Sequence, residues 1–364
     1  MSSTFIDQLT CANVRSLSPY ESARRLYSGG QYWLNANESP YSNAYQIDSD
    51  KLNRYPECQP AQVVQSYAAY TGVESQQVLI SRGADEGIEL LIRAFCNPGV
   101  DSIAICPPTY GMYAISAETF NVGVTKAPLT DRFELDFDTL GELADSQSPP
   151  KLVFLCSPNN PTGTRLAADQ IERCLALFAN KSLVVLDEAY IEFDWQNRWS
   201  GKLTEYDNLV ILRTLSKAFA LAGIRCGFTL ASPQIIQTLL KVIAPYPVSE
   251  PVAQIATQAL STKGIAQMRS QVQAIQQQQN NLKAKLGDID ELQQIGDQCA
   301  NFLLYRTKNK AALMDYLVEN GLLIRDQSKQ LQLQDCLRMT IGNAQENSQL
   351  IGLITEFYQQ ESIG

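Results

Sequence analysis

The stretch LVILRTLSKAFALAGIRCGFTL, residues 209–230, holds two apolar runs on either side of a segment of small residues. Each run, LVILR and GFTL, is short and rich in β-branched or aromatic residues, which favours buried β-strands. Lys217 follows Ser216 just after the first run ends, and Arg225 stands just before the second run. Because ligands bind where the strands of such sheets end, we take Lys217 and Arg225 as candidate functional residues.

The same alternation of short apolar runs and helical segments extends from about residue 77 to residue 230. The other strand candidates are QVLIS (77–81), SIAIC (102–106), KLVFLC (151–156) and SLVVLD (182–187). Their two-sided apolar character predicts an α/β fold in which helices cover both faces of a mostly parallel sheet. One such helix is predicted over GADEGIELLIRAF (83–95), whose apolar residues recur at helical spacing.

The region after residue 230 has a different pattern. PYPVSEP at 245–251 reads as a linker, and a long helix is predicted after it, with the QQQQ run at 276–279 as its solvated face. FLLY at 302–305 and CLRMTIG at 336–342 predict part of a smaller α+β unit. The predicted divisions are an N-terminal arm with part of the small domain (1–50), a large ligand-binding domain (51–264) and a small C-terminal domain (265–364).

Composition excludes several classes of function. A formal charge of −9 argues against general affinity for nucleic acid or anionic membranes. No signal-peptide run is present, and no stretch approaches the roughly 18 apolar residues of a membrane span. The nine cysteines are odd in number and never spaced as C-x-x-C, which indicates reduced thiols in the cytoplasm and no zinc cluster. The absence of histidine leaves lysine, carboxylates, tyrosine or a cofactor to carry protons.

Polar residues follow the predicted strands where each strand ends. Because those ends meet at one edge of a parallel sheet, we expect the residues to share one site. They are Tyr110 after SIAIC, Asn160 in the turn SPNNPTG, Asp187 and Tyr190 after SLVVLD, and Ser216 and Lys217 after LVILR. The backbone amides of Ala84 and Asp85 open the predicted helix at 83–95, where free amides can bind an anion.

This set of side chains fits a carbonyl cofactor such as pyridoxal phosphate. Burial and a nearby cation lower the pKa of an amine, and only a neutral amine, as Lys217 would have to be, forms a Schiff base. The cofactor also needs a partner for its ring nitrogen, for which Asp187 is the candidate, and a phosphate cup. Arg225 and Ser216, with the helix amides, can form that cup.

Taken singly, each of these residues has a more ordinary interpretation. Lys217 would be a surface lysine, Asp187 a turn residue and Arg225 one half of a surface ion pair. SPNNPTG alone is a turn, and Tyr110 alone is a half-buried aromatic residue. The functional interpretation therefore depends on their joint occurrence at strand ends.

Over almost its whole length the chain resembles the fold-type I, pyridoxal-phosphate-dependent aminotransferases. The motifs that carry the resemblance are LSPYESARRL, LNANESP, NRYPE, RGADEGIELLIRAF, PPTYGMY, SPNNPTG, LDEAYIEF, RTLSKAFALAGIRCGF and LRMTIG. SPNNPTG, D-x-A-Y and S-K-x₇-R are highly specific for the superfamily, whereas LSPYESARRL and LNANESP, together with RTLSKAFALAGIRCGF, point to its histidinol-phosphate branch. Asn343 and Ala344 after LRMTIG, and the pair at 39–40, depart from the usual pattern.

The resemblance implies roles for individual residues. Lys217 would bind the cofactor and move a proton at the substrate α-carbon, with Asp187 at the ring nitrogen and Tyr190 at the phenolic oxygen. The implied cofactor-binding residues are Ala84, Asp85, Tyr110, Asn160, Asp187, Tyr190, Ser216, Lys217, Arg225 and, donated to the neighbouring subunit of a homodimer, Tyr55. The implied substrate-binding residues are Tyr20, Asn37, Asn160, Arg325 and Arg338, of which Arg338 would grip the α-carboxylate of glutamate.

The resemblance also implies an activity. It is the exchange of an amino group between L-glutamate and imidazole acetol phosphate, giving L-histidinol phosphate and 2-oxoglutarate in the cytoplasm. An aromatic or broad-specificity aminotransferase and a threonine-phosphate decarboxylase-like enzyme share the same scaffold. A cofactor-binding regulator is disfavoured by the short, non-basic N-terminus, and a NAD-dependent dehydrogenase by the lack of G-x-G-x-x-G after any predicted strand.

Overall fold

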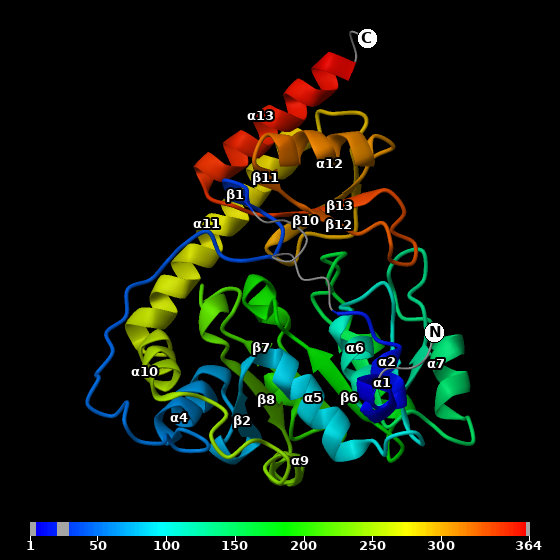
Figure 1. The fold of residues 1–364 in the computed structure, drawn as a ribbon, viewed down its shortest axis with the longest axis vertical. Helices are drawn as coiled ribbons and strands as arrows, with labels where there is room; N and C mark the ends of the chain where they lie inside the picture. The colour runs from blue at the N-terminus through cyan, green and yellow to red at the C-terminus, as the bar shows by residue number, and fades with distance from the viewer. Residues whose placement is uncertain (1–4, 20–28, 362–364) are drawn as a thin grey trace.

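The computed structural model describes residues 5–19 and 29–361, and its centre is a seven-stranded sheet of order β2-β8-β7-β6-β5-β3-β4 (Figure 1). The six predicted strands are β2 (Val78–Ser81), β3 (Ser102–Ile105), β5 (Leu152–Cys156), β6 (Leu183–Asp187), β7 (Leu209–Thr214) and β8 (Gly227–Ala231). The prediction of an α/β fold with a mostly parallel sheet is confirmed. The seventh strand, β4 (Gly123–Lys126), was missed because it is a half-exposed edge strand without an apolar run.

One strand, β8, runs opposite to the others. Its first residue, Gly227, pairs with Ser81 at the end of β2 and with Thr214 at the end of β7. The chain therefore enters β8 at the edge where the parallel strands end, and this brings Arg225 to the same edge as Lys217.

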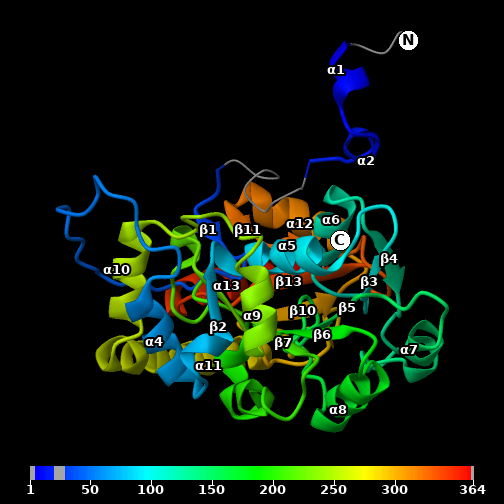
Figure 2. The same cartoon turned by 90° about the horizontal axis from the view of Figure 1, so that it is seen from below.

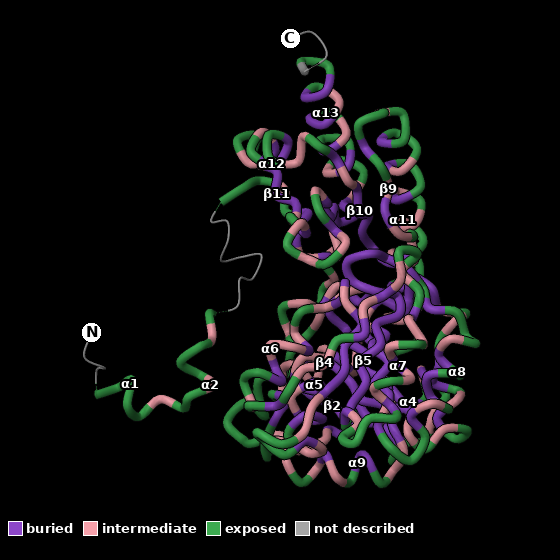
Figure 3. Tube along the Cα trace, turned by 90° about the vertical axis from the view of Figure 1, so that its right-hand side faces the viewer, coloured by how far each residue is buried: buried purple, intermediate pink, exposed green. Residues whose placement is uncertain are grey.

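The residues of each strand alternate between the two faces of the sheet. Phe154 and its neighbours on one face pack against α5 (Gly83–Phe95), α6 (Met112–Thr119) and α9 (Pro233–Leu239). Val153 and its neighbours on the other face pack against α4 (Ala61–Thr71), α8 (Ala168–Leu177) and α10 (Glu250–Ala259). Figure 2 shows these layers from below, and Figure 3 shows that the buried residues concentrate in the strands. The sheet is thus covered on both faces, as the two-sided apolar runs predicted.

A second, antiparallel sheet of order β12-β13-β10-β9 lies above the first in Figure 1. Its strands are β9 (Gln293–Ile295), β10 (Phe302–Arg306), β12 (Arg325–Asp326) and β13 (Cys336–Thr340), and its helices are α12 (Lys310–Glu319) and α13 (Ala344–Glu361). A parallel pair, β1 (Tyr32–Trp33) with β11 (Leu322–Leu323), joins the N-terminal segment to this part of the chain. The division of the chain at residues 51 and 265 stays a prediction.

The remaining elements are α1 (Phe5–Leu9), α2 (Ala12–Arg15), η1 (Ser75–Gln77), α7 (Phe137–Ala144), η2 (Ile191–Asn197), η3 (Ser200–Lys202), η4 (Ala222–Ile224) and α11 (Thr262–Leu286). In residues 5–19 and 29–361, no helix combines the length and apolar character needed to cross a membrane.

The long helix α11 corrects one expectation. The QQQQ run was predicted to be solvated, but Gln279 is only 3% exposed. Its side-chain amide donates to the carbonyls of Ala300 and Phe302 at 2.8 and 3.2 Å. A buried amide with two acceptors is well satisfied, so Gln279 ties α11 to the second sheet.

A buried group of charges lies behind the site edge of the first sheet. The Arg213 side chain is fully buried, and its Nε and Nη2 donate to Glu188 Oε2 at 2.8 and 2.6 Å. Glu188 Oε1 accepts the backbone N–H of Trp199 at 2.8 Å. Glu192 is buried beside this ion pair, and burial raises its pKa to about 7. Arg213 therefore has two carboxyl groups near it. Glu188 forms the ion pair, and the raised pKa of Glu192 favours the protonated form of the Glu192 carboxyl group.

We expect Glu192→Gln to flatten the dependence of stability on pH. The pKa of Glu192 in the folded chain lies above its ordinary value of 4.5, so its protonated form stabilises the fold and this contribution is lost as pH rises through about 7. Between pH 5.5 and 8.5 the wild-type free energy of unfolding should fall by about 2 kcal/mol through this group, whereas the variant should not show this loss.

Urea unfolding of both proteins at the two pH values measures the difference. Glu291→Gln, a change at an exposed glutamate, is the matched control and should follow the wild type. Parallel pH profiles for wild type and Glu192→Gln would contradict the assignment.

Candidate active site

A cavity of about 580 Å³ lies where the parallel strands of the first sheet end. The predicted site residues that line it are Asn37, Ala84, Asp85, Tyr110, Asn160, Asp187, Tyr190, Ser216, Lys217, Arg225, Arg325 and Arg338. Tyr20 lies outside the described residues. Tyr55 lies away from the cavity, where its ring is 82% exposed and stacks on Tyr246 with centroids 4.4 Å apart.

An anion cup forms between the start of α5 and the turn before β8. Arg225 has a left-handed backbone with φ of 55°, and its Nη1 donates to Ser216 Oγ at 3.1 Å. Gly83, with φ of 81°, begins α5, and a Cβ added there would lie 2.6 Å from Arg225 Nη2. Only glycine lets the guanidinium approach the amides of Ala84 and Asp85 so closely. A guanidinium, a hydroxyl and a helix N-terminus at one place suit a phosphate group.

The side chain of Asp85 has contacts that the sequence did not reveal. Sequence reasoning used only its backbone amide. Its carboxylate accepts from Arg225 Nη2 at 3.1 Å and from the Tyr110 hydroxyl at 3.0 Å. Asp85 therefore links the cup to the aromatic residue that was predicted to lie against the cofactor ring.

Asp187 ends β6 at the bottom of the cavity, and only 3% of it is exposed. Its carboxylate accepts the Tyr113 hydroxyl at 2.6 Å and the Ala189 N–H at 3.0 Å. Burial is the main cause that raises the pKa of Asp187, to about 6. A cation held against this carboxylate would lower its pKa again. Tyr113 was missed, although it follows Tyr110 by one helical turn in the motif PPTYGMY.

Lys217 follows β7 and is half-buried. Its Nζ donates to the Ala36 carbonyl at 3.0 Å and lies 5.8 Å from the centre of the Tyr190 ring. Burial, and after it the cation of Arg338, lowers the pKa of Lys217 to about 8. At pH 7 roughly a tenth of this amine is therefore neutral, compared with less than a thousandth for an ordinary lysine.

Two arginines lie side by side on adjacent strands of the second sheet. Arg338 on β13 is the direct cross-strand partner of Arg325 on β12. Arg338 is buried; its Nη2 donates to the Asn35 carbonyl at 3.0 Å, and its Nη1 contacts Asn160 Oδ1. Like charges directly opposite each other are unfavourable unless an anion lies between or beside them. This pair therefore suits substrates with carboxylate or phosphate groups.

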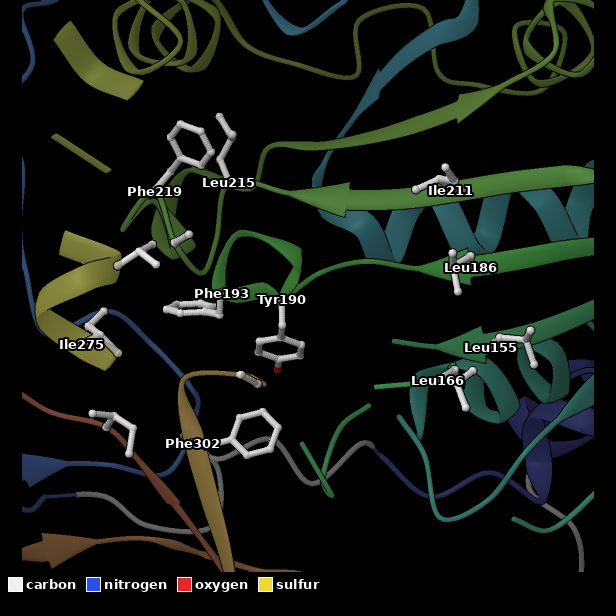
Figure 4. Close-up of a cluster of buried hydrophobic side chains, with 14 of the residues drawn as sticks. Leu155, Leu166, Leu186, Tyr190, Phe193, Ile211, Leu215, Phe219, Ile275 and Phe302 are labelled. Carbon is white, nitrogen blue, oxygen red and sulfur yellow. The ribbon is translucent and has the colours of Figure 1, made fainter. Parts of the chain in front are cut away.

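Tyr190 lies between the two sheets. Figure 4 shows its ring next to Phe302 of β10, edge to face, with centroids 5.3 Å apart and planes at 84°. Asn37 Nδ2 donates to the Tyr190 hydroxyl at 2.9 Å. Asn37 was predicted to contact substrate, and the structure also gives it this contact with Tyr190.

The chain is similar to known proteins over almost its whole length. Residues 30–354 match the model of the aminotransferase class I and II family. The chain is 56% identical over 357 residues to the histidinol-phosphate aminotransferase of Pseudoalteromonas atlantica, covering 97% of this chain and 95% of that protein.

Solved structures share the fold. Histidinol-phosphate aminotransferase from Sinorhizobium meliloti, in complex with pyridoxal-5′-phosphate, has a TM-score of 0.83 at 21% identity, covering 96% of this chain and 98% of that chain. L-threonine-O-3-phosphate decarboxylase from Porphyromonas gingivalis has a TM-score of 0.74 at 22% identity, covering 90% of this chain and 100% of that chain. At these identities the likeness speaks for the fold alone.

We expect Arg338→Met to raise the pKa of Lys217 above about 8, because the variant removes the cation that opposes the protonated amine. The pH dependence with which the cofactor-free protein reacts with an amine-specific reagent, followed at Lys217 by mass spectrometry, measures this pKa. Arg173→Met, a change at an exposed arginine on α8, is the matched control and should leave the midpoint in place. An unchanged midpoint in Arg338→Met would contradict the electrostatic account.

Proposed function

The chain belongs to the class I and II aminotransferase family, and from that premise we propose that it moves an amino group between L-glutamate and imidazole acetol phosphate. The products are L-histidinol phosphate and 2-oxoglutarate, in a step of histidine biosynthesis. Relatives named histidinol-phosphate aminotransferase are 51–56% identical to this chain over nearly its whole length, which supports these substrates. The observation that carries the chemistry is the Lys217 amine of lowered pKa, which shares one cavity with Asp187 and Arg338.

The cavity fits pyridoxal phosphate, the cofactor of this family. When bound, this cofactor supplies a carbonyl carbon that takes up the amino group and a ring that withdraws electrons from the substrate α-carbon. The anion cup of Arg225, Ser216 and the amides of Ala84 and Asp85 would hold its phosphate. The glycine at position 83, where a Cβ would strike the guanidinium, keeps the cup open.

Four side chains would hold the cofactor ring. The buried carboxylate of Asp187 would keep the ring nitrogen protonated, since the pair of charges stabilises both partners in a site that excludes water. Tyr190 and Asn160 would hydrogen-bond the phenolic oxygen, and Tyr110 would lie against the ring.

Lys217 would act at two points of the reaction. Its amine is neutral often enough to bond covalently to the cofactor carbonyl carbon. Once released, the neutral Nζ would be a base that takes a proton from the substrate α-carbon, and its protonated form would be an acid that delivers this proton to the former carbonyl carbon of the cofactor.

Arg338 and Arg325 would select the substrates. A guanidinium binds a carboxylate through two parallel hydrogen bonds, so Arg338 would anchor the α-carboxylate of glutamate. Arg325, directly opposite, would meet the phosphate of the imidazole substrate, with Tyr20 and Asn37 as further substrate contacts. The two arginines explain how one cavity can accept both a dicarboxylate and a phosphate ester.

We propose that the enzyme is a cytoplasmic homodimer. Tyr55 is highly exposed and lies outside the cavity of its own chain, on the extended segment before α4. That position supports donation of the Tyr55 hydroxyl to the cofactor phosphate of a neighbouring subunit. Each active site would then need two chains.

Rates with three amino donors distinguish the proposal from its rivals. We expect turnover with L-histidinol phosphate and 2-oxoglutarate to exceed turnover with phenylalanine by at least roughly tenfold in kcat/KM, since Arg325 and Arg338 line the cavity and can bind the phosphate group that phenylalanine lacks. Threonine phosphate should release no carbon dioxide. Preference for phenylalanine would favour an aromatic aminotransferase, and carbon dioxide release would favour a decarboxylase.

Lys217→Ala should lose the glutamate-induced bleaching of the visible band that the wild-type holoenzyme shows, because no amine remains to move the α-carbon proton, and should lose kcat by at least about a thousandfold. Lys181 pairs with Asp145 and does not line the cavity, so Lys181→Ala is the control and should keep both properties. Retention of the glutamate-induced change in Lys217→Ala would contradict the role of Lys217.

Mixed dimers test the role of Tyr55. Tyr55→Ala should lower kcat by at least about tenfold through weaker hold on the phosphate, while Lys217→Ala is inactive. A dimer with one chain of each variant has one site with both native residues. Co-expression should therefore restore roughly a quarter of wild-type activity. A specific activity equal to the mean of the two separate variants would contradict a shared site.

A further inference from the structure

The short segment 35–37 is in contact with several residues of the site. Its three successive backbone carbonyls each accept a hydrogen bond of 3.0 Å from a side chain: Arg338 Nη2 bonds Asn35, Lys217 Nζ bonds Ala36 and Asn301 Nδ2 bonds Asn37. Asn37 is 1% exposed and has a left-handed backbone, with φ of 54°. Asparagine is one of the few residues other than glycine that adopt this conformation readily.

The hydrogen bonds of Asn37 have a fixed direction. Its backbone N–H donates to Thr340 Oγ1 at 2.9 Å, so the oxygen of this threonine is an acceptor there. The threonine hydroxyl in turn donates to Asn37 Oδ1 at 3.2 Å. Because Oδ1 faces Thr340, the amide nitrogen of Asn37 faces the other way, and it donates to the Tyr190 hydroxyl oxygen at 2.9 Å. An amide nitrogen only donates, so the Tyr190 oxygen must accept in this pair.

This arrangement determines what Tyr190 can do. Its oxygen accepts from Asn37, which leaves its own proton available for donation to another group. Burial raises the pKa of Tyr190 well above its usual range, so the proton is retained. The residue lines the cavity, and the charged groups near it are Arg338, Asp187 and Lys217. The first of these lies two positions before Thr340 on β13, hence on the same face of that strand.

We infer that Asn37 and Thr340 are positioning residues that make the Tyr190 hydroxyl a hydrogen-bond donor toward the cavity. The group that accepts this bond is the phenolic oxygen of the cofactor ring, so the inference rests on the proposed function. A donor at that oxygen stabilises its anionic form. Asn37 thus acts on the chemistry through Tyr190, in addition to any contact with substrate.

The pH titration of the visible absorption band of the holoenzyme tests the inference. Tyr190→Phe removes the donor, so the midpoint should move up by about one unit, because the oxygen then holds its proton more tightly. Thr340→Val keeps nearly the same side-chain shape but removes the hydroxyl, so the side-chain amide of Asn37 becomes free to turn. The midpoint of Thr340→Val should therefore move up by part of the shift expected for Tyr190→Phe. Thr340→Ser keeps the hydroxyl and is the matched control, with the wild-type midpoint.

Two further variants exclude a general structural effect. Asn37→Asp keeps the shape and tolerates the left-handed backbone but places an acceptor against Tyr190, so its midpoint should rise at least as far as that of Tyr190→Phe, with a loss of kcat of at least roughly tenfold. In the Tyr190→Phe background, Thr340→Val should cause no further shift. An equal shift of Thr340→Val in both backgrounds, or an unchanged midpoint in Tyr190→Phe, would overturn the inference.

Thermal unfolding of the cofactor-free proteins provides a readout that does not depend on the proposed function. The unfolding temperatures of Thr340→Val, Tyr190→Phe and the double variant should be non-additive, because the three residues form one chain of bonds. Additive changes would overturn the inference even if the enzyme is an aminotransferase. Failure of the wild type to bind pyridoxal phosphate would instead refute the proposed function. The unfolding temperatures of the three variants would then still test the hydrogen bonds among Thr340, Asn37 and Tyr190.

Discussion

The close approach of two backbones, at Gly83 and Gly227, is the constraint on which the site depends. A Cβ added at Gly227 would lie 2.3 Å from the carbonyl carbon of Gly83, which no side chain tolerates. The approach brings the start of α5 against the start of the antiparallel strand β8. The free amides of the helix and the side chain of Arg225 consequently meet at the edge where β5, β6 and β7 end. A cavity with an anion cup at one end follows from this packing.

The second sheet lines the cavity with Arg325 and Arg338, and the segment 35–37 connects this sheet to Lys217. This segment hydrogen-bonds to Lys217 beside the first sheet and to Arg338 and Thr340 on β13. Arg338, which is expected to hold the substrate carboxylate, and Thr340, which orients Tyr190 through Asn37, therefore lie two positions apart on β13. Both residues also hydrogen-bond to the segment 35–37, so the expected contact with the substrate and the orientation of Tyr190 share one strand and one segment.

Sequence reasoning predicted the strands and the strand-end residues because both have local signatures. Apolar runs identify buried strands such as β5, and a polar residue after the run, such as Asp187, marks the site edge. Contacts between distant segments have no such signature. One example is the hydrogen bond between Tyr113 and Asp187, and others are the hydrogen bonds of Asn37 to Tyr190 and Thr340. These bonds join residues that lie 74 to 303 positions apart in the sequence. The half-exposed strand β4 was missed for a different reason, since its four residues carry no apolar run.

In a chain without histidine, burial is the main cause that brings the pKa values of two groups toward neutrality from opposite sides. It raises the pKa of the Asp187 carboxyl to about 6 and lowers that of the Lys217 amine to about 8, because the charged form of each group is the less favourable one away from water. The two groups therefore respond differently to an incoming ligand. A cation at the bottom of the cavity favours the ionised Asp187, whereas an anion beside Arg338 weakens the positive field that helps to lower the pKa of Lys217. The neutral amine is thus most abundant before a substrate carboxylate arrives, which suits the proposed order in which Lys217 would first bond to the cofactor and afterwards accept a proton.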